Sequence, residues 1–597
     1  MKRKSAKYPS NLQIAKLFRS VSAALELSPG DNRFRIAAYD RAADSIEHAS
    51  SDLKDLWDDN RLSDLPGVGT NMAEHLDELF KTGAVKHFEI LLKPFPPAMF
   101  ELLEVPGIGP KKAFSLCKAL GLSKSHTAIK ELEKAAKRGH IASIDGFGPD
   151  SEAQILQNIR EFKDRSKRML LPVAEKIAAD LVAWMLKNPA VKQADALGSL
   201  RRKSATVGDI DIAVSTTDPQ AAIHHFVAYP RLVRVIESGP ISATILLPDN
   251  ISVDLLTGMP ERYGSLLQHF TGSKLHNIAL RELALKKGLS LSEYGIKSAD
   301  KTIPFKTETD FYHHLGLQYI PPEIREGAGE IELAESNRLP ELIELTDIRG
   351  DLHVHSDINV EPSHDLGTSS ISELAKSAGA VGYEYLGLTE HNPSFSQHNV
   401  SQIVNLIKHK TQQINEFNQD HENKHENVPY IFNGLEIDIR PDGSRALPDI
   451  CLDDLDYACV SVHNSFKLGQ KTMTDRVLAG LDHPKVKFFA HPTGRLIGQR
   501  EGINLDWDRI FDYCLTHDKW LEINSSPDRL DLPDTLVRQA RAAGIKLVIN
   551  TDSHSAAGLG LLRFGVWVAR RGFVQSADVV NTQPFAKLVK ILGKEVT

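Results

Sequence analysis

The sequence predicts a multidomain fold: an all-α N-terminal region, a small α+β domain in the middle, and a C-terminal α/β domain closed as a distorted βα barrel. Three observations predict this order. The chain of 597 residues is too long for a single hydrophobic core. The period of its apolar residues changes twice along its length. A glycine motif also recurs three times near the start, which is typical of an internal repeat.

Composition and charge are those of an ordinary globular chain. Lys and Arg total 71 against 78 Asp and Glu, a net charge of −7, and 41% of the residues are hydrophobic. Contact with a polyanion must therefore come from local features and not from bulk positive charge. The four cysteines lack metal-type spacing and are too few for a disulfide framework, which indicates a reducing compartment.

The first residues are basic, but they are followed by the polar, helix-forming stretch NLQIAKLFRSVSAALEL and not by an apolar signal core. No stretch approaches about 18 uninterrupted apolar residues. We therefore expect a cytoplasmic chain that makes no contact with a membrane.

The glycine repeat predicts the helical region. LPGVGT (65–70), VPGIGP (105–110) and IDGFGP (144–149) each precede a helical stretch, and apolar residues between them recur at intervals of three and four, so residues 1–165 are predicted to be all-helical. Glycine at a helix start lets backbone N–H groups approach a phosphate without a Cβ in the way. The candidate contacts to a nucleic-acid backbone are Gly67, Gly69, Gly107 and Gly109. The third turn carries Asp145 in place of proline. For this turn, a purely structural role is the alternative to phosphate binding.

From about residue 190 the period changes to two. VGDIDIAV (207–214), ATILL (243–247) and ISVDLL (251–256) are predicted strands separated by turn residues. Asp209 and Asp211 would point to one face, and Asp254 on a separate strand can complete a three-carboxylate site for two Mg²⁺ or Mn²⁺ ions. The alternative for two such aspartates alone is a solvated strand edge. The upstream GSLRR (198–202), with a phosphate-type turn and two arginines, favours the metal site.

The third region follows the Pro- and Glu-rich connector PPEIREGAGEIELAESNRLPE (321–341). Short apolar strands such as YLGLT, FFAH, LEIN and KLVINTDSH then alternate with helices, which predicts parallel βα units and a barrel as their closure. Histidines and carboxylates follow these strands in DLHVH (351–355), LTEH (388–391), GLEID (434–438), SVHNS (461–465), AHPTGR (490–495) and NTDSH (550–554). Mixed imidazole and carboxylate ligands suit Zn²⁺, Mn²⁺ or Fe²⁺ better than Mg²⁺ alone.

The motifs of the first half resemble those of family X DNA polymerases over residues 1–320. The resemblance rests on GSLRRK, VGDIDI and VDLL together with HFTGSKLHNIALRE (269–282) and the first two glycine turns, which it identifies as DNA-binding helix-hairpin-helix motifs. It implies a polymerase-beta-like palm and thumb in which Asp209, Asp211 and Asp254 are the catalytic metal ligands. The implied nucleotide-binding residues are Gly198, Ser199, Arg202, Phe270, Thr271, Gly272, Asn277 and Arg281.

Two positions depart from that family. His75 stands where the family has the lysine that removes 5′-deoxyribose phosphate, and an imidazole is a poor substitute for an imine-forming amine, which argues against lyase activity. His269 replaces the tyrosine before FTGS, at the position that discriminates against ribonucleotides.

The C-terminal motifs are similar to those of the PHP (polymerase and histidinol phosphatase) domain, over residues 345–575. The resemblance implies a metal-dependent phosphoesterase with up to three Mn²⁺ or Zn²⁺ ions. Its implied ligands are His353, His355, His391, Glu436, His463, His491, Asp552 and His554. A further acidic ligand falls in SDINVEPSHDLG (356–367), with Asp365 as the first candidate and Glu361 and His364 as alternatives. Glu390 replaces the usual aspartate beside His391.

The join of the two halves is similar to that of bacterial PolX proteins. The predicted domains are 1–90 and 91–165 (helical, DNA-binding), 166–260 (palm), 261–320 (nucleotide selection), 321–344 (linker) and 345–597 (PHP). The implied function is a monomeric DNA repair enzyme that fills gaps in primer-template DNA with deoxynucleoside triphosphates and carries a Mn²⁺-dependent 3′–5′ exonuclease or 3′-end-processing activity. Two alternatives remain: a DNA-end-binding scaffold with an idle palm, and a barrel that hydrolyses a small phosphate ester.

Overall fold

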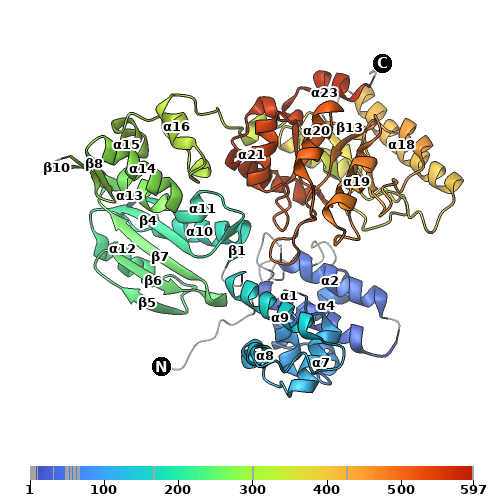
Figure 1. Cartoon of the computed structure of the whole chain (residues 1–597), viewed down its shortest axis with the longest axis horizontal. Coiled ribbons are helices and arrows are strands. Elements are labelled where there is room, and N and C mark those ends of the chain that lie inside the picture. The colour runs from blue at the N-terminus through green and yellow to red at the C-terminus, as the bar shows by residue number, and fades with distance from the viewer. Residues whose placement is uncertain are drawn as a thin grey trace. The chain divides into compact units, whose positions relative to one another are not determined.

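The computed structural model describes residues 9, 11–30, 32–47, 53, 57, 62, 68–105, 107–165, 168–298, 301–424 and 428–594. The chain folds as two compact units, residues 1–168 and residues 169–597 (Figure 1). Within the described ranges, no helix has both the length and the apolar content needed to cross a bilayer. All four cysteines are buried and unpaired.

The first unit is helical throughout its described residues, as predicted. Its elements are α1 (Asn11–Leu27), α2 (Arg33–Glu47), α4 (Thr70–Thr82), α5 (Lys86–Leu92), α6 (Pro97–Leu102), α7 (Pro110–Leu120), η2 (Ser125–Thr127), α8 (Ala128–Lys137) and α9 (Pro149–Arg165). One apolar core joins α1, α2, α4 and α5, and a second joins α6 to α9. Helix-period spacing builds these cores, since Met72, Leu76, Leu79 and Phe80 of α4 are all buried.

The second unit begins with a five-stranded mixed sheet of order β2-β4-β7-β6-β5. Its strands are β2 (Val191–Ala196), β4 (Ile210–Thr216), β5 (Arg234–Ser238), β6 (Ser242–Leu246) and β7 (Ser252–Gly258), with the two-residue pair β1 (Met169–Leu170) and β3 (Thr206–Val207) beside it. Strands β4 and β7 run parallel and their other neighbours run antiparallel. Helices α10 (Leu171–Met185) and α12 (Pro219–Val227) pack their apolar sides into the same core as the sheet. The three predicted strands correspond to β4, β6 and β7, whereas β5 is exposed along its whole length and carries no alternating pattern.

The next segment is largely helical. After β7 it contains α13 (Tyr263–Thr271), α14 (Lys274–Lys286), β8 (Leu289–Ser292), β9 (Gly295–Ser298), β10 (Lys301–Ile303) and α15 (Glu308–His314). The short helix α11 (Gly198–Arg201) belongs to the preceding domain, between β2 and β3. Strands β8 to β10 form a small antiparallel sheet.

Residues 321–344, predicted as a linker, are instead packed against this segment. They form η5 (Pro322–Ile324) and α16 (Glu330–Glu335), and two of their charged residues are fully buried. Arg325 pairs with Glu308, and Glu330 pairs with His276. Charged residues are seldom fully buried, so this Pro- and Glu-rich segment is predicted to be a linker. The partners that allow its charges to be buried lie elsewhere in the chain.

The C-terminal half is built from eight parallel strands in two sheets. They are β11 (Gly350–Val354), β12 (Tyr385–Leu388), β13 (Tyr430–Asn433), β14 (Glu436–Asp438), β15 (Ala458–Ser461), β16 (Val486–Phe489), β17 (Trp520–Asn524) and β18 (Leu547–Asn550). A parallel bridge from Val354 of β11 to Ser553 connects the first sheet to the end of the second. A second bridge, from His391 just beyond β12 to Glu436, continues the pairing of β12 from β13 into β14, which follows β13 after two residues. The strands therefore close into a distorted barrel, and the paired edges leave few open backbone groups.

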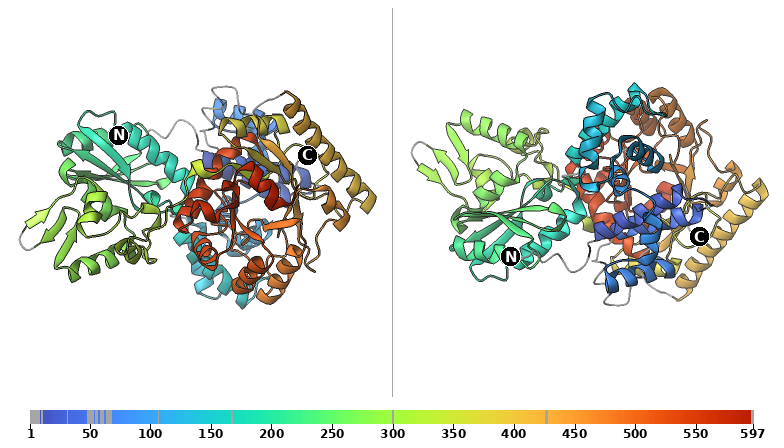
Figure 2. Two further views of the ribbon diagram at one scale, coloured as in Figure 1. Left: turned by 90° about the horizontal axis from the view of Figure 1, so that it is seen from above. Right: turned by 90° about the horizontal axis from the view of Figure 1, so that it is seen from below.

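Helices follow the strands around this barrel. They are α17 (Ile371–Ala380), α18 (Val400–Lys424), α19 (Gln470–Leu481), α20 (Trp507–Thr516), α21 (Asp534–Ala543), α22 (Leu562–Arg571) and α23 (Phe585–Leu592), with short η6 (Leu345–Asp347), η7 (Asp449–Asp454), η8 (Ala556–Leu561), η9 (Ser576–Asp578) and η10 (Val580–Thr582). Figure 2 shows the orange and red helices on the outside of the strands. Nearly every residue of the strands is buried, as expected for parallel strands covered by helices.

Candidate active sites

The glycine turns give helices α4, α7 and α9 the same start. Gly69, Gly109 and Gly148 each place a carbonyl that accepts the first helical hydrogen bond, from Ala73 at 3.0 Å in α4 and from Ala113 at 2.9 Å in α7. A Cβ at any of these glycines would have no atom within 4 Å. The unpaired N–H groups of each helix start are therefore open to an approaching phosphate. The candidate Gly67 lies outside the described residues.

The third turn has the backbone of the second despite its different sequence. Gly107 and Gly146 adopt φ of 78° and 81°, a region that favours glycine. The following turns are closed by Ile108 N–H to Val105 at 3.1 Å and by Phe147 N–H to Ile144 at 2.9 Å. A Cβ at Gly107 would also lie 2.9 Å from Nδ2 of Asn158, so a larger residue would have to displace that side chain.

Gly109→Ala is expected to weaken binding of duplex DNA about three- to tenfold without lowering the melting temperature. The backbone there is extended (φ −79°) and the space is open, so alanine fits the fold, but its Cβ stands in front of the helix N-terminus. Gly148→Ala makes the same change at the third turn and measures separately how much that turn contributes to binding. Fluorescence anisotropy at one fixed salt concentration measures both variants. Equal affinity of Gly109→Ala and the wild type would show that this turn does not touch DNA.

The palm carboxylates lie on neighbouring strands. Asp211 of β4 and Asp254 of β7 are partners in the parallel register, and Asp209 stands one residue before β4. Burial and the negative charges of Asp209 and Asp254 raise the pKa of Asp211 to about 6. Thr244 Oγ1 donates to Asp254. A carboxyl held in its charged form at this cost is typical of a site that binds cations.

The Gly198–Ser199 turn lies directly against these carboxylates. Gly198 has φ of 57°, and a Cβ there would lie 2.8 Å from Oδ2 of Asp211. Leu197 N–H donates to the carbonyl of Asp211 at 2.8 Å, which fixes the turn on the strand. Glycine is therefore needed at this position, and Ser199 follows it half-buried at the start of α11.

The two arginines after this turn have different partners. Arg201 is held by Glu308, which it contacts at 2.6 Å and which also pairs with the buried Arg325. Arg202 donates through Nε to Glu326 at 3.0 Å and through Nη1 to the Thr271 carbonyl at 2.6 Å. No sequence pattern predicts the roles of Glu308, Arg325 and Glu326, because each lies more than a hundred residues from the arginines and outside any motif.

The remaining nucleotide-binding candidates lie on α13 and α14 and in the turn between them. Thr271 and Gly272 are buried, whereas Phe270 is 36% exposed and Arg281 is exposed. Asn277 accepts from Gln268 at 2.9 Å and donates to the His269 carbonyl at 2.8 Å, which ties the two helices together. Phe270 and Arg281 thus present an aromatic ring and a cation on the open side of these helices.

His75 of α4, at the position discussed for lyase activity, is packed among aromatic rings. Its ring stacks on His87 with centroids 5.4 Å apart and meets Phe88 edge-on. Burial and the charge of His87 lower its pKa. A neutral, stacked imidazole is consistent with a packing role.

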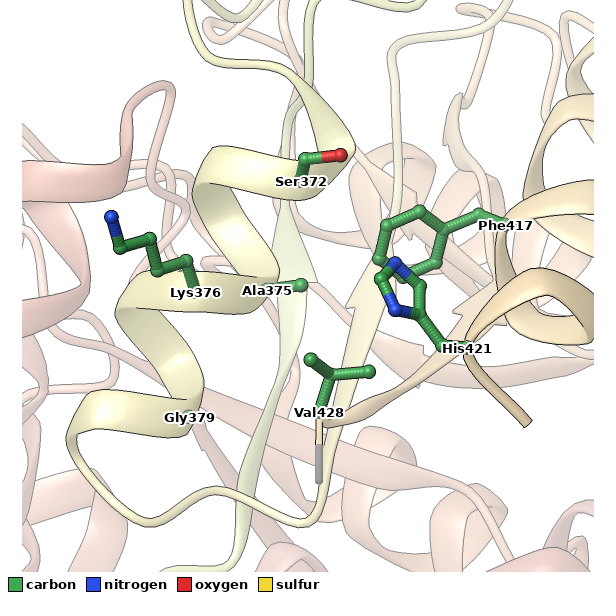
Figure 3. A pocket seen from close by; sticks show the side chains of 7 residues that line it. All are labelled: Ser372, Ala375, Lys376, Gly379, Phe417, His421 and Val428. Atoms are coloured by element: carbon green, nitrogen blue, oxygen red, sulfur yellow. The ribbon is translucent and has the colours of Figure 1, made fainter. Parts of the chain in front are cut away.

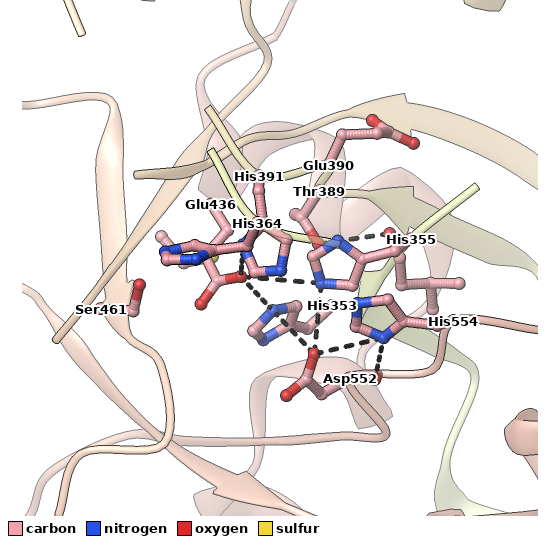
Figure 4. A network of polar contacts seen from close by, with 12 residues as sticks. His353, His355, His364, Thr389, Glu390, His391, Glu436, Ser461, Asp552 and His554 are labelled. Carbon is pink, nitrogen blue, oxygen red and sulfur yellow. Dashed lines mark hydrogen bonds and ion pairs between the residues drawn. The ribbon is translucent and has the colours of Figure 1, made fainter. Parts of the chain in front are cut away.

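The nine predicted ligands of the barrel converge at one end of its strands, around Glu436. Figure 4 shows His353, His355, His391, Glu436, Asp552 and His554 among them. Glu436 Oε2 lies 2.8 Å from Nδ1 of His391 and 3.5 Å from Nε2 of His353. Its Oε1 lies 3.0 Å from Nε2 of His491 and 3.5 Å from Nε2 of His463. The carboxyl is fully buried, and the surrounding imidazoles hold its pKa well below the usual range although burial acts to raise it.

The other contacts extend the cluster to both sides. Asp552 Oδ1 lies 3.2 Å from Nε2 of His355 and 3.6 Å from Nε2 of His353. The spacing of Asp552 and His554 predicts that both lie on a strand. In the structure they lie instead in the loop just beyond β18, where Asp552 has φ of 54°. The physical reason is the positive φ of Asp552, which takes the backbone out of the extended conformation before His554 is reached.

Several buried nitrogen and oxygen atoms of the cluster lie near charged neighbours but make no hydrogen bond of good geometry. They are Nε2 of His353, both ring nitrogens of His355, Nδ1 of His391, Nδ1 of His491, Nε2 of His554 and Oε2 of Glu436. Buried polar groups are normally satisfied. Three overlapping groups of these side chains each bring their ligand atoms within 4.8 Å of one another: His355, His391 and His554; His353, His355, Glu436 and Asp552; and His391, Glu436 and His463. Such groups fit metal ions as the missing partners. Imidazole and carboxylate donors in this mixture suit Mn²⁺, Zn²⁺ or Fe²⁺.

Asp365 is the acidic residue that reaches the cluster from the 356–367 loop. Its carboxylate lies 3.4 Å from Nε2 of His391 and 3.5 Å from Nε2 of His554. The alternative Glu361 instead pairs with His398, and the alternative His364 pairs with Asp438. Although burial acts to lower it, the charges of Glu436 and Asp365 raise the pKa of His391 to about 10.

Asp365→Ala is expected to remove one of the bound metal ions and to slow phosphodiester hydrolysis about tenfold or more, because His391 and His554 lose the carboxylate that completes their site. Glu361→Ala, in the same loop, is the matched control. Elemental analysis of the dialysed proteins counts the ions. Equal metal content in the two variants would mean that Asp365 is not a ligand.

The sequence patterns do not predict two carboxylates that orient candidate metal ligands of the barrel. Glu522 of β17 accepts from Nδ1 of His353 at 2.7 Å, and Asp438 of β14 accepts from Nδ1 of His463 at 2.7 Å. Each bond leaves the Nε2 of its histidine facing the cluster, as metal-ligating histidines require. The GLEID motif contained Asp438, two residues after Glu436, which was an available signal. Glu390 binds Lys410 at 2.8 Å and points away from the cluster.

A separate cleft lies outside the barrel, between α17 and the C-terminal end of α18 (Figure 3). Ser372, Ala375, Lys376, Gly379, Phe417, His421 and Val428 line it. None of these residues belongs to either cluster described above, so the cleft is not part of the candidate active sites.

Comparisons with known proteins match several parts of this chain. The family models that match are the DNA polymerase beta thumb (residues 266–326), a helix-hairpin-helix domain (residues 9–85) and a SAM-like helix-hairpin-helix tandem (residues 99–161). The thumb match extends past residue 320 and includes Arg325 and Glu326, in keeping with the packed linker.

Similar proteins match over different lengths. DNA polymerase lambda of Rattus norvegicus is 25% identical over 53% of this chain and 56% of its own, and that of Arabidopsis thaliana is 25% identical over 50% and 58%. The DNA polymerase/3′-5′ exonuclease PolX of Bacillus subtilis (strain 168) is 33% identical over 576 residues, which are 96% of this chain and 97% of the relative. With this identity along almost the whole of both proteins, the chain belongs to the PolX family.

Proposed function

We propose that this chain is a DNA repair enzyme that adds nucleotides to a primer in gapped DNA and removes nucleotides from 3′ ends, with one active site for each reaction. Two observations carry the proposal, in a chain whose relative is a DNA polymerase/3′-5′ exonuclease. Asp211 and Asp254 lie in register on neighbouring strands with Asp209 close by, and imidazoles and carboxylates of metal-ligating type gather around Glu436. The helix-hairpin-helix regions supply binding to the DNA backbone.

For nucleotide addition, Asp209, Asp211 and Asp254 would hold two Mg²⁺ or Mn²⁺ ions. When bound, these ions supply Lewis acidity toward the primer hydroxyl and charge neutralisation at the phosphates. The Gly198–Ser199 turn and Arg202 would hold the triphosphate of a deoxynucleoside triphosphate beside the carboxylates. The sheet contributes position, since the register of β4 and β7 fixes Asp211 and Asp254 side by side.

For nucleotide removal, the barrel cluster would hold up to three Mn²⁺ or Zn²⁺ ions through the nine residues from His353 to His554 named above. When bound, the ions polarise a phosphodiester and activate water for hydrolysis. Glu522 and Asp438 hold the imidazoles of His353 and His463 in the tautomer that presents Nε2 to the cluster. We further propose that the chain acts as a monomer on gapped or primer-template DNA.

Gapped duplex DNA with a labelled primer tests both activities in one molecule. With deoxynucleoside triphosphates and Mg²⁺ or Mn²⁺, the primer is expected to lengthen to the end of the gap. Without the triphosphates and with Mn²⁺, it is expected to shorten from its 3′ end. A primer that changes length under neither condition would refute the proposal, and extension without shortening would refute its exonuclease half.

A further inference from the structure

A carboxylate after α15 joins an arginine of the palm to an arginine of the barrel. Oε1 of Glu326 accepts from Nε of Arg202 at 3.0 Å and from Nη1 of Arg571 at 2.9 Å. Arg571 is the last residue of α22, and the two arginines are 369 residues apart in the sequence. One carboxylate oxygen thus bridges two guanidinium groups from the two halves of residues 169–597.

Arg571 is held in this place by further contacts. Its Nη1 also donates to the backbone carbonyl of Arg202 at 2.7 Å, and its other side pairs with Asp534 at 2.7 Å. The side chain is 10% exposed, and that of Arg202 is 14% exposed. Ion pairs removed from water in this way are screened less than surface pairs. The planar guanidinium can serve all three acceptors at once, which a lysine could not do with the same geometry.

The arrangement changes the charge that Arg202 offers to a ligand. Glu326 neutralises much of the positive charge of Arg202. Arg571 donates a hydrogen bond to the same carboxylate oxygen and so neutralises part of the charge of Glu326. Without Arg571, the whole negative charge of Glu326 would fall on Arg202. The net charge around the Gly198–Ser199 turn would become more negative by one unit, which opposes the approach of a triphosphate.

We propose that Arg571, in the C-terminal barrel, is a positioning residue for nucleotide addition: through Glu326 it keeps Arg202 available to the incoming triphosphate. The inference rests on the proposed role of Arg202 in nucleotide binding. It gives the barrel a second role, in which the helix after its last strand sets the affinity of the palm for deoxynucleoside triphosphates. The contact also explains why a carboxylate is tolerated beside an arginine that must bind an anion.

Arg570 offers a matched control. It is the neighbour of Arg571 on α22 and also makes ion pairs across the same contact, with Glu323 at 3.0 Å and with Glu344. It does not touch Arg202 or Glu326 in any described contact. Arg570→Ala therefore loosens the contact between α22 and η5 to a similar degree without changing the charge beside Arg202.

Single-nucleotide gap filling by the full chain tests the inference. Arg571→Ala is expected to raise the KM for the incoming nucleotide about fivefold with kcat nearly unchanged. Arg571→Lys keeps the charge but not the contacts to all three acceptors, so it should recover part of this loss, and Arg570→Ala should leave KM unchanged. Glu326→Gln should rescue Arg571→Ala, because the double variant restores the charge balance around Arg202.

Three results would overturn the inference: an unchanged KM in Arg571→Ala, an equal rise of KM in Arg570→Ala, or a double variant no better than Arg571→Ala. Each of these leaves wild-type gap filling, and so the proposed function, intact. If the wild type itself adds no nucleotide, the proposed function fails. In that case the Kd of a deoxynucleoside triphosphate with Mg²⁺, measured by calorimetry on the same variants, still decides whether Arg571 acts on binding at the turn.

Discussion

Replacing Asp211 by asparagine is expected to reduce primer extension on gapped DNA by at least about 1,000-fold, because the neutral side chain no longer completes the metal site with Asp209 and Asp254. The strand register leaves no other carboxylate in position to compensate, since Asp254 is already its neighbour on β7. Shortening of the primer without triphosphates should proceed at the wild-type rate, because that reaction belongs to the barrel. Extension is followed on gels with one labelled primer.

The thermal stability of the metal-free protein shows whether Asp211→Asn loses primer extension because it loses the metal site or because it unfolds. The pKa of Asp211 is about 6 in the folded chain and 3.8 as the ordinary value, so folding favours its protonated form. Stability from this group is present below pH 4 and is lost as the pH rises through 6, which amounts to roughly 2–3 kcal/mol at neutral pH. Asp211→Asn avoids that loss. With EDTA at pH 7.5, the variant should melt at a higher temperature than the wild type, and the difference should shrink toward pH 4. A variant that melts lower, or that still extends primers, would contradict the proposed role.

Replacing Glu436 by glutamine is expected to reduce 3′–5′ degradation at least about 100-fold and to lower the number of tightly bound metal ions. Glu436 lies within 3.6 Å of five imidazoles, more than any other acidic residue of the cluster, so its charge is shared by more than one ion site. Glutamine keeps the shape but not the charge. Elemental analysis after dialysis gives the metal content, and primer shortening with Mn²⁺ gives the activity.

Asp442→Asn is the control for this variant, since Asp442 is an exposed carboxylate four residues after Asp438 whose described contacts go to Ser444. It should keep full metal content and full degradation, and both variants should extend primers like the wild type. Loss of primer extension in Glu436→Gln would mean that the two sites depend on each other. Unchanged degradation would mean that Glu436 is not part of the nuclease site.

The sequence predicted the groups whose chemistry is local. A Gly-apolar-Gly turn before a helix depends on a few neighbouring residues, and the structure has the same backbone at Gly107 and Gly146. Alternating apolar residues predicted the strands of Asp211 and Asp254 for the same reason. The helical N-terminal region and the βα order of the C-terminal half also follow from short-range periods, and the comparisons confirm the family that these motifs suggested.

Partners that are distant in the sequence could be found only in the tertiary structure. Glu522 orients His353 from 169 residues away, and no spacing rule marks a single glutamate on a buried strand as its partner. Residues 321–344 differ from the predicted linker because Arg325 and Glu330 are buried against Glu308 and His276, and no local pattern marks such distant partners.

The sequence by itself determined the kinds of side chain that each site contains, because the chemistry of metal and phosphate binding restricts residue type and short spacing. The tertiary structure decided which of them meet. Asp365 reaches the histidines while Glu361 does not, and Glu326 connects Arg202 to Arg571. These pairings depend on how strands close into a barrel and on which charges can be neutralised when they are buried, and both are properties of the whole fold.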